Sequence, residues 1–482
     1  MEQSFALVEN LLLKKQQRFT DFEASRITGV AIDQVKDALE KLLEKYVCRM
    51  QVTENGDLIY DFGPKPRRRG EKTAAEILQA IGDWLWKVFT VLFKIWLTVT
   101  LLVYFVIFVI LIILLIVASS SQRDSKSRGS SSIRFSGGGG IPIFDILWSI
   151  FRWRTITGGI VRRNDRRGYH YNAYEPHQAV LKKDKKNLVA SVHDFVFGPP
   201  RVDIDPLQNE REVAAFLETN KGILVSADLE ALAGLNCAQA EYALTDYLIR
   251  FEGDVDVSEN GAVYGKFERI LRGVEDTDGE IIYYWNEYEP EYHTTGNTPQ
   301  RNFFIALMNG VNLLVSYSVM RGNFDMLSDA DFNGLAGAFV QIILDHQLLF
   351  GGIPFVFSIL FFLVPLVRWL KIRRLRQQRH KNNIRKRLYK VIFSNAGTPQ
   401  SAENIVAKVN HSGVEETLAD KTISTFMDEL VLDLNGETVI SEDAKIQYHF
   451  PRISLEQKEA VALRSRSKMN RDLGDVVFDT DK

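Results

Sequence analysis

The sequence predicts an α+β membrane protein in which three transmembrane helices carry three winged-helix-like modules, each of three helices and a β-hairpin. Three observations predict this class: three long apolar segments, a hairpin pattern that occurs three times, and a helical pattern before each hairpin. The chain of 482 residues is long enough for about two to four domains. Its net charge of −2 conceals strong local differences in charge.

The hairpin pattern is clearest in its first two copies. Residues Val52–Phe62 read Val-Thr-Glu-Asn-Gly-Asp-Leu-Ile-Tyr-Asp-Phe, and Val257–Phe267 match them in the same register 205 positions later (257 against 52). A looser third copy runs from Ser441 to Phe450. Each copy places a turn rich in Asn, Asp or Gly beside alternating apolar residues, which predicts a β-hairpin.

The first module is predicted over residues 1–64. Apolar residues at helical spacing predict a helix around Phe5–Leu12 and another around Ile32–Leu43. Between them, Thr20 and Glu23 have the spacing of a capping box, which predicts the start of a helix. Three helices and a hairpin in roughly 60 residues are the winged-helix arrangement, a member of the helix-turn-helix group.

The second and third modules are predicted over residues 211–270 and 387–453. The second follows the first without a gap from the turn onward, with Gly234 at the position of Gly29. The third matches less well, and we expect an insertion around residues 434–436. It shares the pattern Phe-x-Arg-Ile with the second module, at the end of each hairpin.

Three segments, 84–118, 302–320 and 350–370, are apolar enough to cross a bilayer, which needs about 20 residues per helix. The first is too long for one untilted pass, so its aromatic and basic beginning is expected at the interface. We favour a single pass over a re-entrant hairpin, because no turn interrupts it. Basic residues flank both of its ends, so the sequence leaves the side of the first module open.

A basic run after the third segment orients the remaining chain. It begins with Arg368, Lys371, Arg373, Arg374 and Arg376, and such runs mark the cytoplasmic side. These residues are also candidates for contacts with anionic lipid headgroups, at about 1 kcal/mol each. We therefore expect an integral protein of the bacterial inner membrane, with the second and third modules in the cytoplasm.

Four polar residues are candidate intramembrane sites. Asn309 and Asn312 lie within the second span, where amides commonly form hydrogen bonds between helices. Asp345 and His346 lie near the start of the third span, at the interface or within the membrane. Intramembrane ionisable groups raise the possibility of a solute path, which is the alternative role for all four residues.

The other segments are predicted as connections. They are a basic linker (65–83), a flexible Ser/Arg/Gly linker (119–140), an interfacial helix and aromatic loop region (141–210), a linker (271–301), an outer loop (321–349), a polybasic juxtamembrane segment (371–386) and a polar tail (454–482). For the helix expected at 141–154, packing on a soluble domain is almost as plausible as a place in the membrane interface.

The charges of the modules argue against nucleic acid as a partner. DNA affinity depends largely on Lys and Arg that neutralise phosphates. Over residues 5–64, 211–270 and 387–453, the modules have 8, 5 and 6 basic residues against 10, 11 and 10 acidic ones. No catalytic motif, phosphate-binding loop or metal-ligand spacing is present, and the two cysteines lie far apart, so we predict no catalytic, cofactor or metal site.

The chain also resembles a family of uncharacterised integral membrane proteins from cyanobacteria, other bacteria and plant chloroplasts. The similar patterns are Phe195–Gly198 before the second module, Gly310–Leu313 in the second span and Val364–Trp369 closing the third. Some plant members carry an iron–sulphur cluster biosynthesis label. Two isolated cysteines give that label no support, because a cluster normally takes four thiolates.

We therefore predict a non-enzymatic membrane scaffold or adaptor whose modules bind an unidentified protein partner. Membrane lipid is a second expected partner, and the spans could support a homo-oligomer. Two alternatives stay open at this stage. One is a membrane-tethered transcription regulator, and the other is a subunit of an oligomeric transporter or channel.

Overall fold

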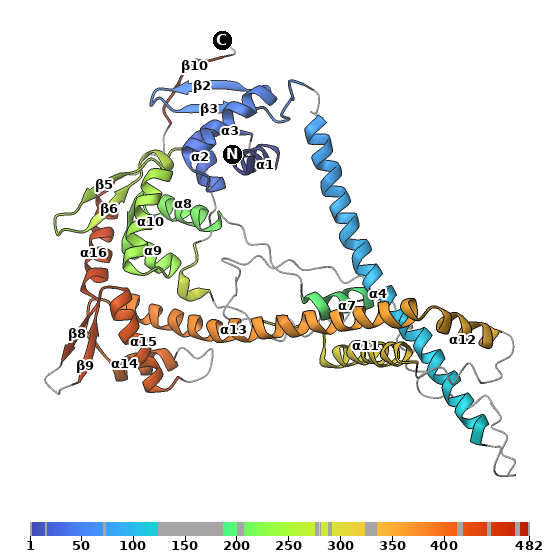
Figure 1. The fold of residues 1–482 in the computed structure, drawn as a ribbon. Coiled ribbons are helices and arrows are strands. Elements are labelled where there is room, and N and C mark those ends of the chain that lie inside the picture. Colours follow the sequence, from blue (N-terminus) through green and yellow to red (C-terminus); the bar gives the residue numbers. More distant parts are fainter. Residues whose placement is uncertain are drawn as a thin grey trace.

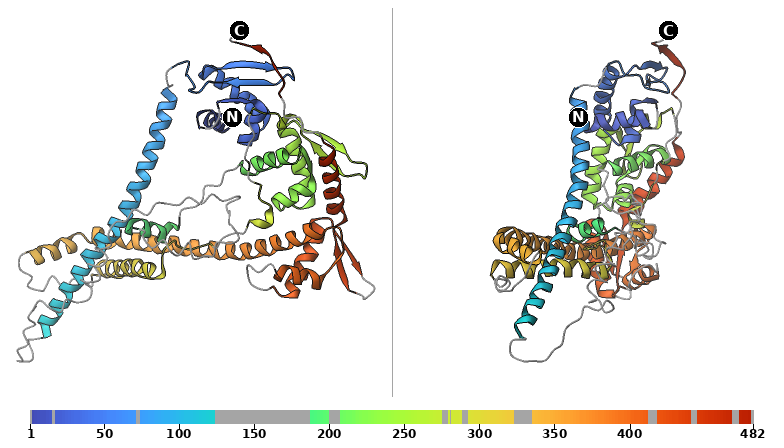
Figure 2. Two further views of the ribbon diagram at one scale, coloured as in Figure 1. Left: turned by 180° about the vertical axis from the view of Figure 1, so that it is seen from behind. Right: turned by 90° about the vertical axis from the view of Figure 1, so that its right-hand side faces the viewer.

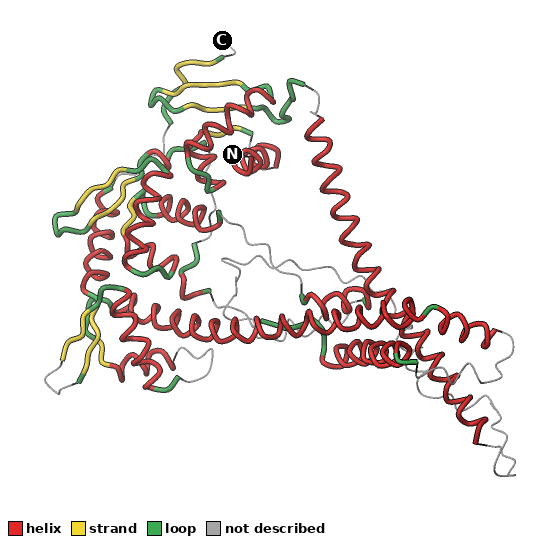
Figure 3. Tube along the Cα trace, in the orientation of Figure 1, coloured by secondary structure: helices red, strands yellow, loops and turns green. Residues whose placement is uncertain are grey.

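The computed structural model describes most of the chain, with helices as the main element and short strands in three places (Figure 3). In Figure 1 the long helices α4 and α13 and a column of three small units form the sides of a triangle. The described residues are 2–14, 17–70, 74–123, 187–199, 207–274, 279, 281–287, 292–322, 335–411, 418–440, 445–467 and 473–480.

Unit 1 has six elements around one apolar core. They are α1 (Glu2–Lys14), β1 (Arg18–Thr20), α2 (Asp21–Thr28), α3 (Ile32–Lys45), β2 (Arg49–Thr53) and β3 (Leu58–Asp61). Helix α2 begins where predicted, because the Thr20 and Glu23 side chains form the capping box. Strand β1 was not predicted from the sequence, and it pairs with β3.

Unit 2 has the same order of elements. They are α8 (Gln208–Thr219), β4 (Ile223–Val225), α9 (Ser226–Ala233), α10 (Cys237–Arg250), β5 (Asp254–Val257) and β6 (Val263–Lys266), followed by the short 3-10 helices η2 (Arg269–Leu271) and η3 (Tyr284–Asn286). Gly56 and Gly261 both adopt positive φ in the two hairpin turns, and Gly29 and Gly234 do so after α2 and α9. The local sequence match therefore corresponds to a match of backbone conformation.

Unit 3 takes its first helix from the end of α13 (Ile353–Asn395). Its other elements are β7 (Gln400–Ser401), α14 (Ala402–His411), α15 (Asp420–Asp433), β8 (Glu437–Ile440) and β9 (Ile446–His449). The order of helices and strands is again the same. The polybasic segment 371–386 is thus one continuous helix with the third span and with the first helix of unit 3.

The insertion expected at residues 434–436 is not present. Both α10 and α15 end in a three-residue connection in which the middle residue, Glu252 or Asn435, adopts positive φ. The following glycine lies against the phenylalanine of the shared Phe-x-Arg-Ile pattern. A Cβ on Gly253 would lie 2.5 Å from the Phe267 ring, and one on Gly436 would lie 2.7 Å from the Phe450 ring. The phenylalanine of the Phe-x-Arg-Ile pattern therefore makes the same packing contact with a glycine in units 2 and 3.

Among the described residues, three helices are long and apolar enough to cross a membrane, as predicted. These spans are Ile81–Val117, Pro299–Met320 and Leu348–Asn395. The first lies in α4 (Ala74–Arg123), which is a single helix without a hairpin. The second is α11 (Pro299–Met320), and the third comprises the π-helix η5 (Leu348–Gly352) and α13.

The three spans form a bundle whose directions are set by side-chain contacts. The α4 residues Leu101 and Phe108 pack in the same order along the chain as the α11 residues Ile305 and Val315, so α4 and α11 run parallel. Helix α13 runs antiparallel to both, because it begins beside the end of α11, with Gly351 against Met320. The N-terminal ends of α4 and α11 and the C-terminal part of α13 therefore lie at one end of the bundle.

Several segments differ from the expected connections. The region 141–210 contains an apolar helix, α7 (Leu188–Phe197), which packs within the bundle. The expected outer loop contains α12 (Leu335–Asp345). The expected polar tail contains α16 (Pro451–Arg466) and the strand β10 (Val476–Asp479). The linker 119–140 beyond Arg123 and the helix predicted at 141–154 lie outside the described residues.

Candidate functional site

The three units are joined into one column, and the joints are the most elaborate polar sites of the described chain. Helix α16 packs against α9 and β4 of unit 2, and the end of α13 packs beside the same unit. Unit 1 contacts unit 2 from the other side through α2 and α8. Figure 1 shows α16 standing beside unit 2, between units 2 and 3.

The joint between α16 and unit 2 is built on a buried carboxylate. Glu230 of α9 has no exposed surface, and its Oε1 accepts a hydrogen bond from Nη2 of Arg452. Nη1 of Arg452 donates to Glu456 Oε1 at 2.8 Å. Burial raises the pKa of Glu230 to about 8, although Arg452 acts in the opposite direction. Desolvation therefore outweighs the ion pair at this carboxylate.

A second ion pair lies three helical turns further along α16. Nη2 of Arg464 donates to Asp228 Oδ2, and it also donates to the backbone oxygen of Ile223 at 3.1 Å. Asp228 caps α9 by accepting from the backbone N–H of Val225 at 3.0 Å. Glu456, between the two arginines, accepts from the backbone N–H of Ala227 at 2.7 Å. Helix α16 thus supplies hydrogen-bond partners to polar groups at the N-terminal end of α9.

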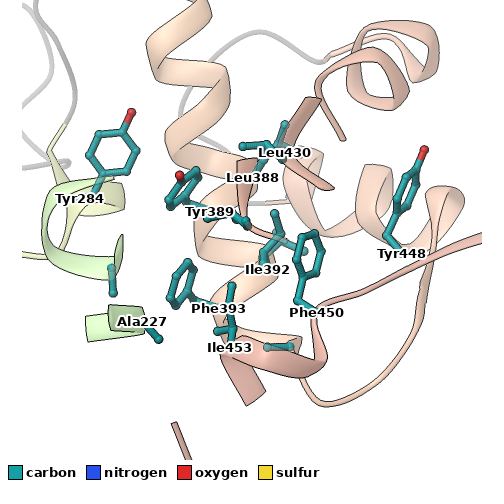
Figure 4. Close-up of a cluster of buried hydrophobic side chains, with 14 of the residues drawn as sticks. Ala227, Tyr284, Leu388, Tyr389, Ile392, Phe393, Leu430, Tyr448, Phe450 and Ile453 are labelled. Atoms are coloured by element: carbon teal, nitrogen blue, oxygen red, sulfur yellow. The ribbon is translucent and has the colours of Figure 1, made fainter. Parts of the chain in front are cut away.

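Units 2 and 3 also share one hydrophobic core (Figure 4). Tyr284 of η3 meets Tyr389 of α13 edge to face, with ring centroids 5.2 Å apart. The Tyr389 hydroxyl donates to the backbone oxygen of Leu235 at 3.0 Å, so it holds the end of α9 against α13. Because this core is continuous, the two units form one folded body rather than two independent domains.

Unit 1 attaches to unit 2 through charged groups that are partly or wholly buried. Arg26 of α2 lies 3.3 Å from Glu218 of α8, and both side chains are buried. Glu23 accepts a hydrogen bond from the backbone N–H of Val274 at 2.9 Å. Lys36 pairs with Glu252 at 2.7 Å at the more exposed margin. A buried charge that loses its partner is strongly destabilising, so these pairs fix how unit 1 sits on unit 2.

The C-terminal strand closes the column. Strand β10 pairs antiparallel with β2, which gives unit 1 a sheet of order β1-β3-β2-β10. Figure 2 shows the C-terminal end, in red, beside unit 1, in dark blue. Asp479 accepts hydrogen bonds from Nε of Arg49 at 2.8 Å and from Nε2 of Gln51 at 2.9 Å. The two ends of the chain thus meet in one sheet.

The third helix of each unit keeps an exposed face that is rich in acids. Exposed acids on α3, α10 and α15 outnumber exposed lysines nine to two among the described residues: Asp33, Asp37, Glu40, Glu44, Glu241, Asp246, Asp420, Asp428 and Glu429 against Lys41 and Lys421. Helix α10 also exposes Tyr242 and Ile249 by more than 70%. The charge counts made from sequence therefore apply to the surface as well.

The structure places Asn309 and Asn312 in the bundle as helix–helix contacts. Nδ2 of Asn309 donates to the backbone oxygen of Ser358 in α13 at 3.0 Å. Nδ2 of Asn312 donates to the backbone oxygen of Leu101 in α4 at 3.1 Å. Both side chains are fully buried. Asp345 and His346 are exposed and come just before η5, which contacts the C-terminal end of α11 at Met320. The four residues therefore do not form one site.

The candidate lipid-contacting residues surround α13 as it leaves the bundle. Lys371, Arg373, Arg374 and Arg376 are exposed, which agrees with a place at a membrane surface. Arg368 is half-buried, and its guanidinium lies against Gly198 at the end of α7, where a Cβ would be 1.4 Å from Nη1. Arg368 is therefore at least partly a structural contact.

Sequence reasoning did not find the ion pairs of α16. Arg452 and Arg464 are twelve residues apart, about 120° from each other around a helix, so their spacing does not place them on one face. No group of three or more potential metal ligands occurs among the described residues, and Cys48 and Cys237 are free thiols. Compared with protein-family models, with curated proteins and with solved structures, the chain has no match.

Proposed function

We propose that this protein is a membrane scaffold that holds protein partners on a column of three winged-helix-like units. One observation carries the proposal: the units are locked to one another by buried ion pairs and a shared core, while the third helix of each unit stays exposed. A rigid body with several exposed faces is suited to holding partners at fixed separations. It offers no cluster of catalytic groups among the described residues.

All three units belong on the same side of the membrane in this proposal. Unit 1 precedes α4, unit 2 precedes α11 and unit 3 follows α13, and those helix ends lie together at one end of the bundle. Unit 1 contacts unit 2 through α2 and α8, which supports placing both units on one side of the membrane. The two basic runs, before α4 and after α13, then share one side, which the positive-inside rule makes the cytoplasm.

Protein is the favoured partner because the exposed third helices would repel a DNA duplex. These are the helices that would enter the major groove in a winged-helix regulator, and they carry nine exposed acids against two lysines. Tyr is enriched where proteins bind proteins, and Tyr242 is among the most exposed apolar side chains of unit 2. A transcription regulator is therefore the weaker proposal.

A transporter or channel subunit is also a weaker proposal than a scaffold, because the buried amides in the spans form hydrogen bonds between helices. Asn309 and Asn312 each bond to the backbone of a neighbouring span. The basic residues around α13 fit anionic headgroups at the surface where the helix emerges. The resemblance to the family of uncharacterised membrane proteins is a prediction that names no activity, and homo-oligomer formation is likewise a prediction.

In-cell crosslinking in the native host, followed by purification in mild detergent and mass spectrometry, tests the proposal. We expect one near-stoichiometric partner whose crosslinks fall on lysines of units 1 to 3, such as Lys41 and Lys421. Crosslinks confined to copies of the chain, with none from any unit to another protein, would contradict it. A variant in which Lys41 and Lys421 are both replaced by Arg is the matched control, since it keeps the charge and removes the reactive amines.

A further inference from the structure

The outer strand of each hairpin presents a sheet edge, and the three edges differ in what covers them. Strands β2, β5 and β8 occupy the same position in their sheets, whose orders are β1-β3-β2-β10, β4-β6-β5 and β7-β9-β8. Only β2 has an added strand among the described residues. Strand β5 lies at the outer margin of the column in Figure 1, and all four of its residues are exposed.

The pairing of β10 with β2 shows how such an edge is used in this chain. The backbone N–H of Thr480 donates to the backbone oxygen of Met50 at 3.1 Å, and the N–H of Met50 donates to Thr480 Oγ1 at 3.0 Å. The backbone of Met50 therefore faces away from β3, towards the added strand. The side chains of Arg49 and Gln51 then hold Asp479.

Strand β5 has the same backbone orientation as β2. In unit 1 the N–H of Thr53 donates to Asp57 across the turn at 3.0 Å, and in unit 2 the N–H of Ser258 donates to Ala262 at 2.8 Å. Backbone groups alternate in direction along an antiparallel strand, so Val255 corresponds to Met50 and faces away from β6. The Val255 side chain is 61% exposed. Within the part of the chain that the structure describes, no strand pairs with this edge of β5, so a strand from a partner could add to it.

The charges of the two edges are opposite. By strand register, Asp254 stands at the position of Arg49, and Asp256 at that of Gln51. Asp256 accepts a hydrogen bond from the Tyr264 hydroxyl, whereas the Asp254 side chain is exposed. Two acids on this face would repel the acidic strand β10, and they would also repel β5 of a second copy. The complementary occupant is a basic strand.

We propose that β5 is a docking edge for an extended segment of a partner protein, with Lys or Arg opposite Asp254 and apolar residues on either side. The segment pairs antiparallel with β5, as β10 pairs with β2. The backbone groups of Val255 supply part of the affinity, and Asp254 selects for positive charge. The inference rests on the proposed scaffold function and specifies the chemistry of one of its partners.

Two fluorescent peptides test the inference on the full-length chain in detergent. One is the natural sequence of residues 474–480, GDVVFDT, and the other is its charge-swapped form, GKVVFKT. We expect the basic peptide to bind at least about tenfold more tightly than the acidic one. Asp254→Arg should reverse that preference, because it gives β5 the charge of β2. Val255→Pro should abolish binding, since it removes an outward N–H without removing a bond to β6.

Equal binding of the two peptides, binding of neither, or a preference unchanged by Asp254→Arg would each overturn the inference. If neither peptide binds, Asp254 and Asp256 serve only to prevent other strands from pairing with β5. Circular dichroism and the detergent melting curve of each variant show whether it is folded, and Asp254→Arg changes only an exposed side chain. If a partner is captured in cells but its binding is unchanged by Asp254→Arg, the docking edge is wrong and the scaffold proposal stands.

Discussion

Arg49 and Asp479 lie 430 positions apart in the sequence and form a two-point contact in the structure. The Asp479 carboxylate is buried between Arg49 and Gln51, so the last strand of the chain is held by the first hairpin. A C-terminal segment that looked like a polar tail is thus part of the sheet of unit 1.

The first prediction concerns the α16 joint. Arg452→Ala should lower the free energy of unfolding by about 1–3 kcal/mol at neutral pH, because it leaves the buried Glu230 carboxyl without its hydrogen-bond donor. Chemical unfolding of the detergent-solubilised protein measures this. Arg466→Ala is the matched control on the same helix. Arg466 is 70% exposed and pairs with an exposed Glu259, so we expect a change below about 0.5 kcal/mol. Equal effects of the two changes would contradict the prediction.

The second prediction concerns pH. Burial raises the pKa of Glu230 to about 8, above its ordinary value of 4.5, so the folded state holds this proton more tightly than the unfolded state. The resulting stability is full below pH 4.5 and is lost as the pH rises through about 8. Glu230→Gln should therefore flatten the fall in melting temperature between about pH 4.5 and 8. An unchanged slope in this variant would assign the pH dependence to other groups.

The third prediction concerns β10. A chain ending at Ser467 should fold, but hydrogen exchange at the amides of Met50 and Glu54 should rise about tenfold, because Thr480 and Asp475, which flank β10, supply their acceptors. The amide of Thr53 bonds to Asp57 within the hairpin and serves as the internal control. Comparison of the full and shortened chains by hydrogen-exchange mass spectrometry measures this. Protection unchanged at Met50 would mean that β10 does not pair with β2 in solution.

The fourth prediction concerns topology. Single cysteines placed by Glu40→Cys, Asp246→Cys and Asp428→Cys report on units 1, 2 and 3, since all three side chains are exposed. We expect an impermeant maleimide to label none of them in intact cells and all of them after the membrane is opened. The two native thiols are replaced by Ser beforehand. Burial raises the pKa of Cys48 to about 12 and of Cys237 to about 11, so they should react slowly in any case.

Labelling of the unit 1 position alone in intact cells would contradict the shared side. It would also require the ion pairs between units 1 and 2 to be absent in the membrane. Such a result would therefore test the fold and the topology together.

The fifth prediction concerns the bundle. Asn309→Leu and Asn312→Leu should each destabilise the bundle by about 1 kcal/mol, because each amide bonds to the backbone of another span. Asp345→Ala and His346→Ala should have no measurable effect, since both side chains are exposed. Thermal unfolding in detergent measures all four. A larger effect at His346 than at Asn309 would contradict the prediction that the buried amides stabilise the bundle.

Local features of the fold could be predicted because they depend on neighbours in the sequence. The capping box of Thr20 and Glu23, the glycine turns at Gly56 and Gly261 and the apolar spans each need only a few adjacent residues. The connection at Asn435 and Gly436 was misread as an insertion although Gly436 matches Gly253 in sequence, because the positive φ that Asn435 shares with Glu252 is visible only in the structure.

The sequence alone was enough to predict three apolar spans, three hairpins with helices before them and modules in which acidic residues outnumber basic ones. Tertiary structure alone decided that α16 and β10 join the units, because Arg452 and Glu230, or Arg49 and Asp479, are hundreds of residues apart. It also decided that the units meet at one end of the bundle. Periodicity reports which face of a helix is apolar, whereas the partner of that face depends on the packing of the whole chain.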